Sequence, residues 1–126
     1  MTGYSSNIAD ITMKNTNFRQ VLFTGSHLQL VVMSLLPNED IGAEVHEQVD
    51  QFFRIEKGQG KAILDGVETA LSDDSVVVVP AGTLHNIINT SATEMLKLYT
   101  IYSPPQHKDE TVHKTKFEAE EAEKHE

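Results

Sequence analysis

The chain has 126 residues, of which 39% are hydrophobic, 23% are charged and 6% are aromatic. This is the composition of a globular protein, and the length leaves no room for a second core. Ten lysines and arginines against nineteen acidic residues give a formal charge of −9, which argues against nucleic acid or an anionic membrane as the partner. The absence of cysteine excludes a disulfide scaffold, a thiolate metal site and a cysteine nucleophile, so any metal must be bound through nitrogen and oxygen.

The N-terminal residues 1–6 lack the basic stretch followed by an apolar one that a secretory signal needs. The apolar runs are short, and the four valines at 76–79 fall far below the roughly 20 residues that cross a bilayer. We therefore expect a cytoplasmic protein whose partner is a small molecule.

Residues 1–17 are polar and show neither helical nor strand periodicity, so we expect a loose N-terminal arm. Short segments of strand composition then follow one another, at 20–24, 27–36, 41–46, 51–56, 61–65, 67–71, 75–79, 85–89 and 95–102. This regular spacing, with no helical pattern between the segments, predicts an antiparallel sandwich or barrel over residues 18–105.

Turn residues support the strand assignment. Asp65-Gly66 lies between two apolar alternations and predicts a two-residue hairpin, because a type I′ turn needs positive φ at both central positions. Pro104-Pro105 should end the strand series, since proline cannot donate to a ladder. Within the C-terminal segment 106–126, a capping box begins at Thr115 and predicts a short surface helix from about 116 to 124.

Four polar side chains are predicted to point into the barrel. Alternation along 41–46 places Glu44 and His46 on one face of that segment. Gln51 and His85 each lie on the face that carries the apolar residues of their own strands. An ionised carboxylate in such an interior costs several kcal/mol unless it is paired or bound to a cation.

These residues fall in two motifs that resemble those of the cupins, a family of small jelly-roll barrels. The second cupin motif, Pro-x-Gly-x-x-His-x-x-x-Asn, is matched in full by residues 80–89, although Asp74 stands in place of its leading glycine. The resemblance covers about residues 20–103. It implies an all-β fold, the double-stranded β-helix or cupin jelly-roll barrel, followed here by a short C-terminal helix.

The first cupin motif is matched in spacing but not in every residue. Its pattern is Gly, five residues, His-x-His, three or four residues, Glu, six residues and Gly. Glu44 replaces the first histidine, His46 is the second, Gln51 replaces the glutamate, and Gly58 is the final glycine. Asn38 stands where the first glycine should be.

The resemblance places the family's metal ligands on Glu44, His46, Gln51 and His85. Two imidazoles, a carboxylate and an amide oxygen suit one divalent ion of iron, manganese, nickel, cobalt or zinc, and the sequence does not rank them. An alternative without metal is a hydrogen-bonded quartet, in which Gln51 bonds His46 and Glu44 pairs with His85.

Three functions follow from different classes. The first is a metal-dependent enzyme on a small molecule, either dioxygenase-like or isomerase-like. The second is a non-catalytic barrel that binds a small molecule or a metal, and the third is a structural dimeric barrel. A phosphosugar isomerase would need cations near the pocket, yet Arg54 faces away from Gln51, and Lys57 and Lys61 flank a turn.

Two further features were left open by the sequence. His107 and His113 lie either in a surface segment or in one that folds back over the barrel mouth, where they could supply a general base or support the ligands. Phe52 points out of its sheet, which indicates cover by the N-terminal arm or by another subunit. The resemblance to cupins implies a homodimer through this sheet face.

Overall fold

The computed structural model describes residues 2–124, so the first residue of the expected arm and the last two of the C-terminal segment lie outside it. Within this range the strands are β1 (Arg19–Thr24), β2 (Gln29–Leu35), β3 (Asp50–Lys57), β4 (Gly60–Leu64), β5 (Val67–Leu71), β6 (Val76–Val79), β7 (His85–Asn89), β8 (Leu96–Ser103) and β9 (Val112–His113). The helices are α1 (Ile8–Lys14) and α2 (Lys116–Glu123). No helix of this part of the chain is long and apolar enough to cross a membrane.

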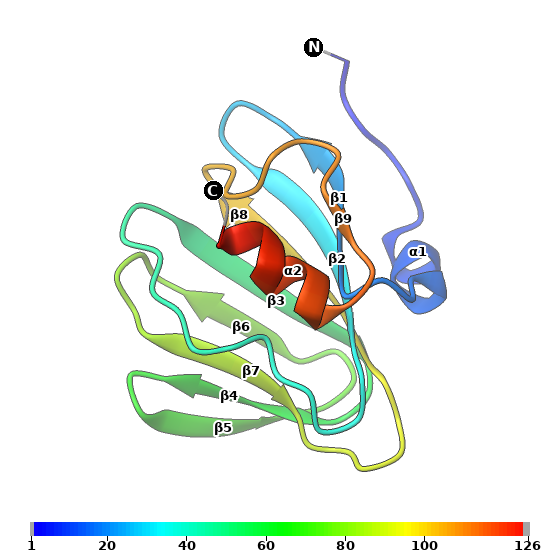
Figure 1. The fold of residues 1–126 in the computed structure, drawn as a ribbon, viewed down its shortest axis with the longest axis vertical. Helices are drawn as coiled ribbons and strands as arrows, with labels where there is room; N and C mark the ends of the chain where they lie inside the picture. Colours follow the sequence, from blue (N-terminus) through cyan, green and yellow to red (C-terminus); the bar gives the residue numbers. More distant parts are fainter. Residues whose placement is uncertain (1, 125–126) are drawn as a thin grey trace.

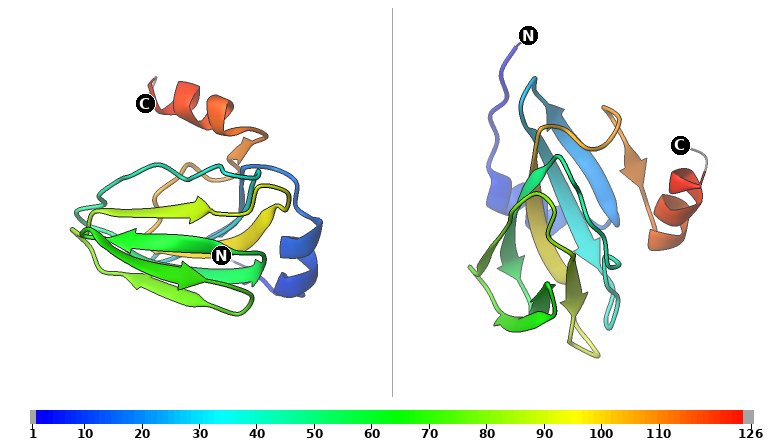
Figure 2. Two further views of the ribbon diagram at one scale, coloured as in Figure 1. Left: turned by 90° about the horizontal axis from the view of Figure 1, so that it is seen from below. Right: turned by 90° about the vertical axis from the view of Figure 1, so that its left-hand side faces the viewer.

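The strands form two antiparallel sheets that pack against each other (Figure 1). The larger sheet has the order β6-β3-β8-β2-β1-β9, and the smaller has the order β5-β4-β7. In Figure 2 the two helices lie on opposite sides of the larger sheet. The predicted all-β barrel with a short C-terminal helix is confirmed.

The interior changes in character along the strands. Phe53 and Ile55 of β3 and Leu98 of β8 are fully buried, and they belong to the apolar core. Further along the same two strands, Gln51 lies beside Tyr102, and both are almost fully buried. The barrel therefore has an apolar end that stabilises the fold and a polar end that carries ionisable and amide groups.

The segment predicted as a strand at 41–46 is not a regular strand. Its backbone pairs with β7 at two isolated bridges, Asp40 with Ile88 and Glu44 with His85. Gly42, between them, has φ +103, and its N–H donates to Asn86 Oδ1 at 3.0 Å. Positive φ interrupts the ladder at this residue, but the segment still runs along the edge of the smaller sheet.

The hairpin predicted at Asp65-Gly66 is confirmed. Asp65 and Gly66 have φ of 47° and 84° and join β4 to β5. The two departures at glycine positions of the cupin motifs also have a structural explanation, because Asn38 and Asp74 have φ of 64° and 69°. Asparagine and aspartate adopt left-handed backbone more readily than other non-glycine residues, so they keep the conformation that the motif glycines would supply.

The loose arm expected over residues 1–17 is wrong for residues 8–14, which form α1. Asn7 caps the helix by accepting from the N–H of Asp10 at 3.0 Å, and Lys14 pairs with Asp10 at 3.0 Å. The helix lies on the outer face of the larger sheet, where Thr12 is buried. Seven residues are too few for a helical period to show in the sequence.

The C-terminal helix begins as predicted. Thr115 Oγ1 accepts from the N–H of Glu118 at 3.1 Å, and the Glu118 carboxylate accepts from the N–H of Lys114 at 2.8 Å. The prediction that the strands end at Pro104-Pro105 is wrong, because β9 follows and pairs with β1. The chain after the prolines thus returns to the barrel.

Gln29 fixes this return. Its Oε1 accepts from the N–H groups of Gln106 and His107 at 3.1 and 2.9 Å, and its Nε2 donates to the His107 carbonyl at 2.7 Å. The same Nε2 lies 3.0 Å from Thr24 Oγ1. The fully buried amide of Gln29 therefore supplies the hydrogen bonds that a neighbouring strand would otherwise make to the backbone of residues 106 and 107.

We predict that Gln29→Leu lowers the free energy of unfolding by about 2–4 kcal/mol, because several buried N–H and C=O groups lose their partners. Urea unfolding followed by circular dichroism measures the change. Gln59→Leu, at an exposed glutamine, is the matched control and should change stability by less than about 0.5 kcal/mol. Equal stability of the two variants would contradict the clamp.

The outer face of the larger sheet is partly apolar. Val78 of β6 is 60% exposed beside Phe52 of β3, which is half-buried. We propose that the expected homodimer forms here, because α1 packs on this face without covering Val78.

Sedimentation at micromolar concentration tests the dimer. Val78→Glu should give monomers, since a charge placed in the interface loses its water. Val67→Glu, on the smaller sheet at 67% exposure, should remain a dimer. A monomeric wild type, or a dimer that Val78→Glu leaves intact, would rule this face out.

Candidate metal centre

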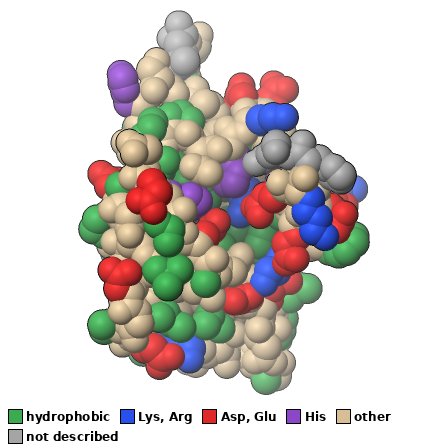
Figure 3. Space-filling model, turned by 60° about the vertical axis from the view of Figure 1, so that its left-hand side comes forward, with side chains coloured by type: hydrophobic (Ala, Val, Ile, Leu, Met, Phe, Trp, Pro, Cys, Tyr) green, Lys and Arg blue, Asp and Glu red, His purple; other side chains and the backbone are tan. Residues whose placement is uncertain are grey.

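Three of the four predicted ligands come together at the polar end of the barrel. One ligand atom each of Glu44, His46 and His85 can be chosen so that all three lie within 4.8 Å of one another, an arrangement that could hold a metal ion. Glu44 Oε2 lies 3.7 Å from His46 Nε2, and the centroids of the two imidazoles are 5.3 Å apart. Figure 3 shows histidine and acidic side chains together in the hollowed middle of this face, beside the C-terminal helix.

The backbone sets this arrangement. Glu44 and His85 exchange two N–H···O hydrogen bonds of 3.0 Å, which align the irregular segment with the start of β7. Side chains two residues apart on an extended segment share a face, so His46 projects toward the same space as Glu44.

The histidines are prepared to ligate through Nε2. His85 Nδ1 lies 3.0 Å from the Thr83 carbonyl, which only accepts, so Nδ1 carries the proton and Nε2 the lone pair. The Nε2 atoms of both His46 and His85 are buried and have no hydrogen-bond partner among the described residues. Both are free to bind an electrophilic ion.

Gln51 lies at the same end of the interior, as predicted. Its Nε2 donates to Thr100 Oγ1 at 2.9 Å, which turns its Oε1 into a buried acceptor with no hydrogen-bond partner in residues 2–124. The alternative quartet without metal does not form as proposed, because Gln51 bonds Thr100 rather than His46. Glu44 pairs with His46 rather than with His85. Gln51 as the fourth ligand stays a prediction.

The charge of Glu44 suits a cation. Burial opposes its ionisation, but the interaction with His46, followed by the charges of Arg19 and His85, outweighs burial and lowers the pKa of the carboxyl. The cluster offers two imidazole nitrogens and one carboxylate, to which the predicted ligand Gln51 would add an amide oxygen. This set fits a divalent first-row metal and leaves room for further ligands.

Behind these residues lies a tyrosine–histidine pair. Tyr102 OH and His107 Nε2 are 3.2 Å apart, and their rings meet edge to face at 5.0 Å. Burial raises the pKa of Tyr102 to about 12, against the opposing charge of Arg19. Burial, followed by the charge of Arg19, lowers the pKa of His107 to about 3. The tyrosine therefore keeps its proton and His107 stays neutral.

This result decides one question that the sequence left open. The segment with His107 folds back over the barrel instead of running along the surface. His113 lies in β9, opposite Arg19 of β1.

Arg19 is the residue that sequence reasoning missed. It is only 2% exposed, and it acts electrostatically on both Glu44 and Tyr102. The inference that few cations lie near the pocket considered Arg54, Lys57 and Lys61 and overlooked Arg19. The signal was available, since Arg19 alternates with the buried Val21, but the strand was expected to begin one residue later.

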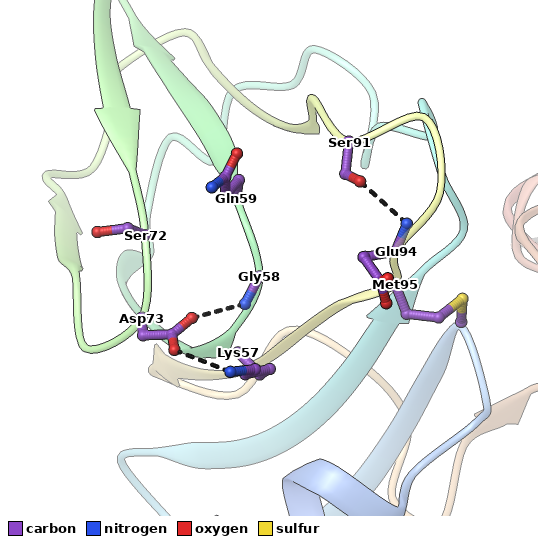
Figure 4. Close-up of a pocket in the computed structure, with 8 residues that line it drawn as sticks. All are labelled: Lys57, Gly58, Gln59, Ser72, Asp73, Ser91, Glu94 and Met95. Carbon is purple, nitrogen blue, oxygen red and sulfur yellow. Dashed lines mark hydrogen bonds and ion pairs between the residues drawn. The ribbon is translucent and has the colours of Figure 1, made fainter.

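Another cavity lies away from this site. It measures about 590 Å³ and opens between the β3–β4, β5–β6 and β7–β8 connections. Its polar groups serve each other: Asp73 accepts from the Gly58 N–H and from Lys57, and Ser91 accepts from the Glu94 N–H (Figure 4). None of the predicted ligands lines this cavity.

Comparison with known proteins agrees with the fold. Residues 31–102 match the model of the cupin domain. The chain belongs to the cupin family. The crystal structure of BH2720 from Bacillus halodurans resembles this cupin with a TM-score of 0.93 and 43% sequence identity, over 95% of each chain.

Two curated relatives of this cupin are also similar in sequence. The uncharacterized protein YrkC of Bacillus subtilis (strain 168) is 50% identical over 123 residues, which are 93% of this chain and 66% of YrkC. The uncharacterized protein L612 of Acanthamoeba polyphaga mimivirus is 48% identical over 107 residues, 82% of this chain and 67% of L612. The chain thus spans about two thirds of the length of these relatives.

The pKa of His107 predicts an acid-sensitive fold. Between the ordinary histidine value of about 6.5 and the folded value of about 3, the unfolded chain binds one more proton at this residue than the folded chain does. Stability should therefore fall as pH decreases through this window, by up to about 1.4 kcal/mol per pH unit from this residue. His107→Gln should remove that part of the slope.

Urea unfolding at pH 7, 6, 5 and 4 measures this slope. His27→Gln is the matched control, because His27 is exposed, and it should keep the wild-type slope. Parallel curves for wild type and His107→Gln would contradict the neutral, buried state of His107.

Proposed function

We propose that this cupin binds one divalent metal ion through Glu44, His46, Gln51 and His85 and uses it to act on a small molecule. The observation that carries the proposal is the set of three buried donor atoms, two imidazole nitrogens and one amide oxygen, that find no hydrogen-bond partner within residues 2–124. An ionised carboxylate lies beside them.

The energetics support a cation at this position. A buried polar atom left without a partner costs about 1–3 kcal/mol, and three such atoms at one end of a small barrel are a concentrated penalty. A metal ion would satisfy all three and would also neutralise Glu44. The donor types suit iron, manganese, nickel, cobalt or zinc.

Such an ion, when bound, would supply Lewis acidity or a binding position for a small molecule in its open coordination sites. The surrounding residues of the chain hold and orient the side chains of the proposed ligands. Thr100 fixes the Gln51 amide, and the Thr83 carbonyl fixes the His85 ring. These two ligand side chains are therefore each oriented by a hydrogen bond on the side away from the ligand atom.

The groups behind the ligands are poor acids and bases at neutral pH. A tyrosine with a pKa of about 12 keeps its proton, and a histidine with a pKa of about 3 hardly accepts one. Tyr102 and His107 therefore support the site rather than transfer protons. This favours a reaction that depends on the metal, dioxygenase-like or isomerase-like, over acid–base chemistry by side chains.

One distant similarity favours the oxidative form. A stretch of 63 residues is 38% identical to a protein named oxidoreductase iacF from Pestalotiopsis fici, over 48% of this chain and 30% of that protein. The alternative is a non-catalytic binding barrel. The same lack of a side-chain acid or base favours this alternative. Once the metal content is known, an assay for catalytic turnover of a small molecule distinguishes the enzyme from the binding barrel.

Metal analysis of protein purified without chelator tests the proposal. We expect about one ion per chain in the wild type, and almost none in His46→Ala or His85→Ala, because the imidazoles are the strongest donors in the set. Glu44→Ala should weaken affinity strongly and Gln51→Ala only modestly, since the amide oxygen carries no charge. His27→Ala, which removes an exposed histidine, should keep the wild-type content.

Circular dichroism of each variant separates lost ligation from lost folding. Equal metal content in the wild type and in a folded His46→Ala/His85→Ala double variant would overturn the metal site. The cluster would then be part of the polar core, and the function would be binding or structural.

A further inference from the structure

We propose that Arg19 binds a carboxylate group of the small molecule on which the metal centre acts. This assigns a substrate class, small carboxylic acids, and it rests on the proposed function only for the role of the metal. The guanidinium site itself is defined by other residues and can be tested separately.

Arg19 is a buried cation with unused hydrogen-bonding capacity. The residue is 2% exposed, and its Nε and Nη1 atoms have no hydrogen-bond partner in the described part of the chain. Nη1 lies 3.7 Å from Oε1 of Glu123 on α2, beyond hydrogen-bond reach. The guanidinium carbon stands 5.3 Å from the centroid of the Phe18 ring, which holds the group from one side.

One cavity is lined both by Arg19 and by one of the candidate ligands, Glu44. It measures about 180 Å³ and lies between α2 and the barrel. Both Arg19 and the ligand Glu44 line it, together with residues 41–43 and one face of α2. Sites for drug-sized molecules are about 300–1,000 Å³, so this cavity fits a molecule of only a few carbon atoms.

The unsatisfied atoms need an anion. A guanidinium presents its N–H groups in a planar fork that a carboxylate can accept with both oxygens. The charge of Arg19 is paired with Glu123 at 3.7 Å, but its Nε and Nη1 atoms make no hydrogen bond within residues 2–124, and a buried donor left without one costs free energy. The Glu123 carboxylate faces the fork at too long a distance to complete it, and its side chain is 50% exposed. The Glu123 carboxylate therefore lies near the position that a ligand carboxylate would occupy, and it competes with that ligand for the guanidinium of Arg19.

Other charges at the cavity limit the ligand to a small negative charge. Glu120 is 4.0 Å from Lys116, which also pairs with Asp40, and Glu44 is directed to the metal cluster. Glu123, which pairs with Arg19 at 3.7 Å, opposes an incoming anion at this position. A monocarboxylate meets less repulsion from these acids than a phosphate dianion does, which is why we assign a carboxylate rather than a phosphate.

Isothermal titration calorimetry on the full chain tests this assignment, with and without zinc. The probes are the monocarboxylates glycolate, pyruvate and lactate, each beside its neutral amide, and inorganic phosphate. We expect the carboxylates to bind and the amides and phosphate not to. Arg19→Met should weaken carboxylate binding by about tenfold or more, because hydrogen bonds to a charged group are lost.

Glu123→Gln provides a second test that does not alter the buried residue. Removing the competing carboxylate should tighten carboxylate binding about two- to fivefold, the range of a partly exposed ion pair. Glu121→Gln is the matched control on the same helix, where Glu121 pairs with Lys124 outside the cavity, and it should leave binding unchanged. If Arg19→Met does not fold, Glu123→Gln decides the question.

The outcomes separate this inference from the proposed function. Carboxylate binding in the metal-free protein that depends on Arg19 supports the inference whether or not zinc binds. The inference is overturned if none of the carboxylates binds to the wild type or to Glu123→Gln. It is also overturned if phosphate or the amides bind equally well, or if Arg19→Met folds and binds as the wild type does.

Discussion

The candidate site depends on one pair of backbone hydrogen bonds, those between Glu44 and His85. They follow Gly42, which interrupts the irregular segment, and they lie where β7 begins. Without them the segment would have no fixed register, and a shift of one residue would turn the side chains of Glu44 and His46 to the outside. The position of three candidate ligands is therefore a matter of backbone pairing at the edge of a three-stranded sheet.

Much of the fold could be predicted because period-two alternation is a local property. Whether a residue faces the core follows from its neighbours, so the inward positions of Gln51 and His85 were accessible from the sequence. The motif comparison then supplied what alternation lacks, the pairing of distant strands. Even its mismatches carry information, because Asn38 and Asp74 hold the left-handed backbone that the missing glycines would have had.

What could not be predicted depends on contacts between residues far apart in the chain. The clamp on the backbone of His107 comes from Gln29, 78 positions earlier, and no local pattern marks a glutamine as a clamp. The role of Arg19 depends on α2, which arrives about a hundred residues later and covers it. The prediction missed the first helix for the opposite reason, because its local signal is weak. The helix is short, and its main signal in the sequence is the N-cap residue Asn7.

The C-terminal segment gives the polar end of the barrel its chemistry. Gln29 holds residues 106 and 107, β9 pairs with β1, and the buried Ala119 of α2 packs into the core. Each contact contributes little by itself, but together they hold the C-terminal segment over ionisable groups of the barrel that would otherwise be exposed to water. A Coulomb interaction that is worth about 1 kcal/mol in water at 4 Å becomes several-fold stronger in such a partly buried site. The same closure that buries Arg19 would also make the proposed carboxylate site selective, because a buried cation discriminates sharply between a charged ligand and its neutral isostere. The returning segment therefore belongs to the site as much as the barrel strands do.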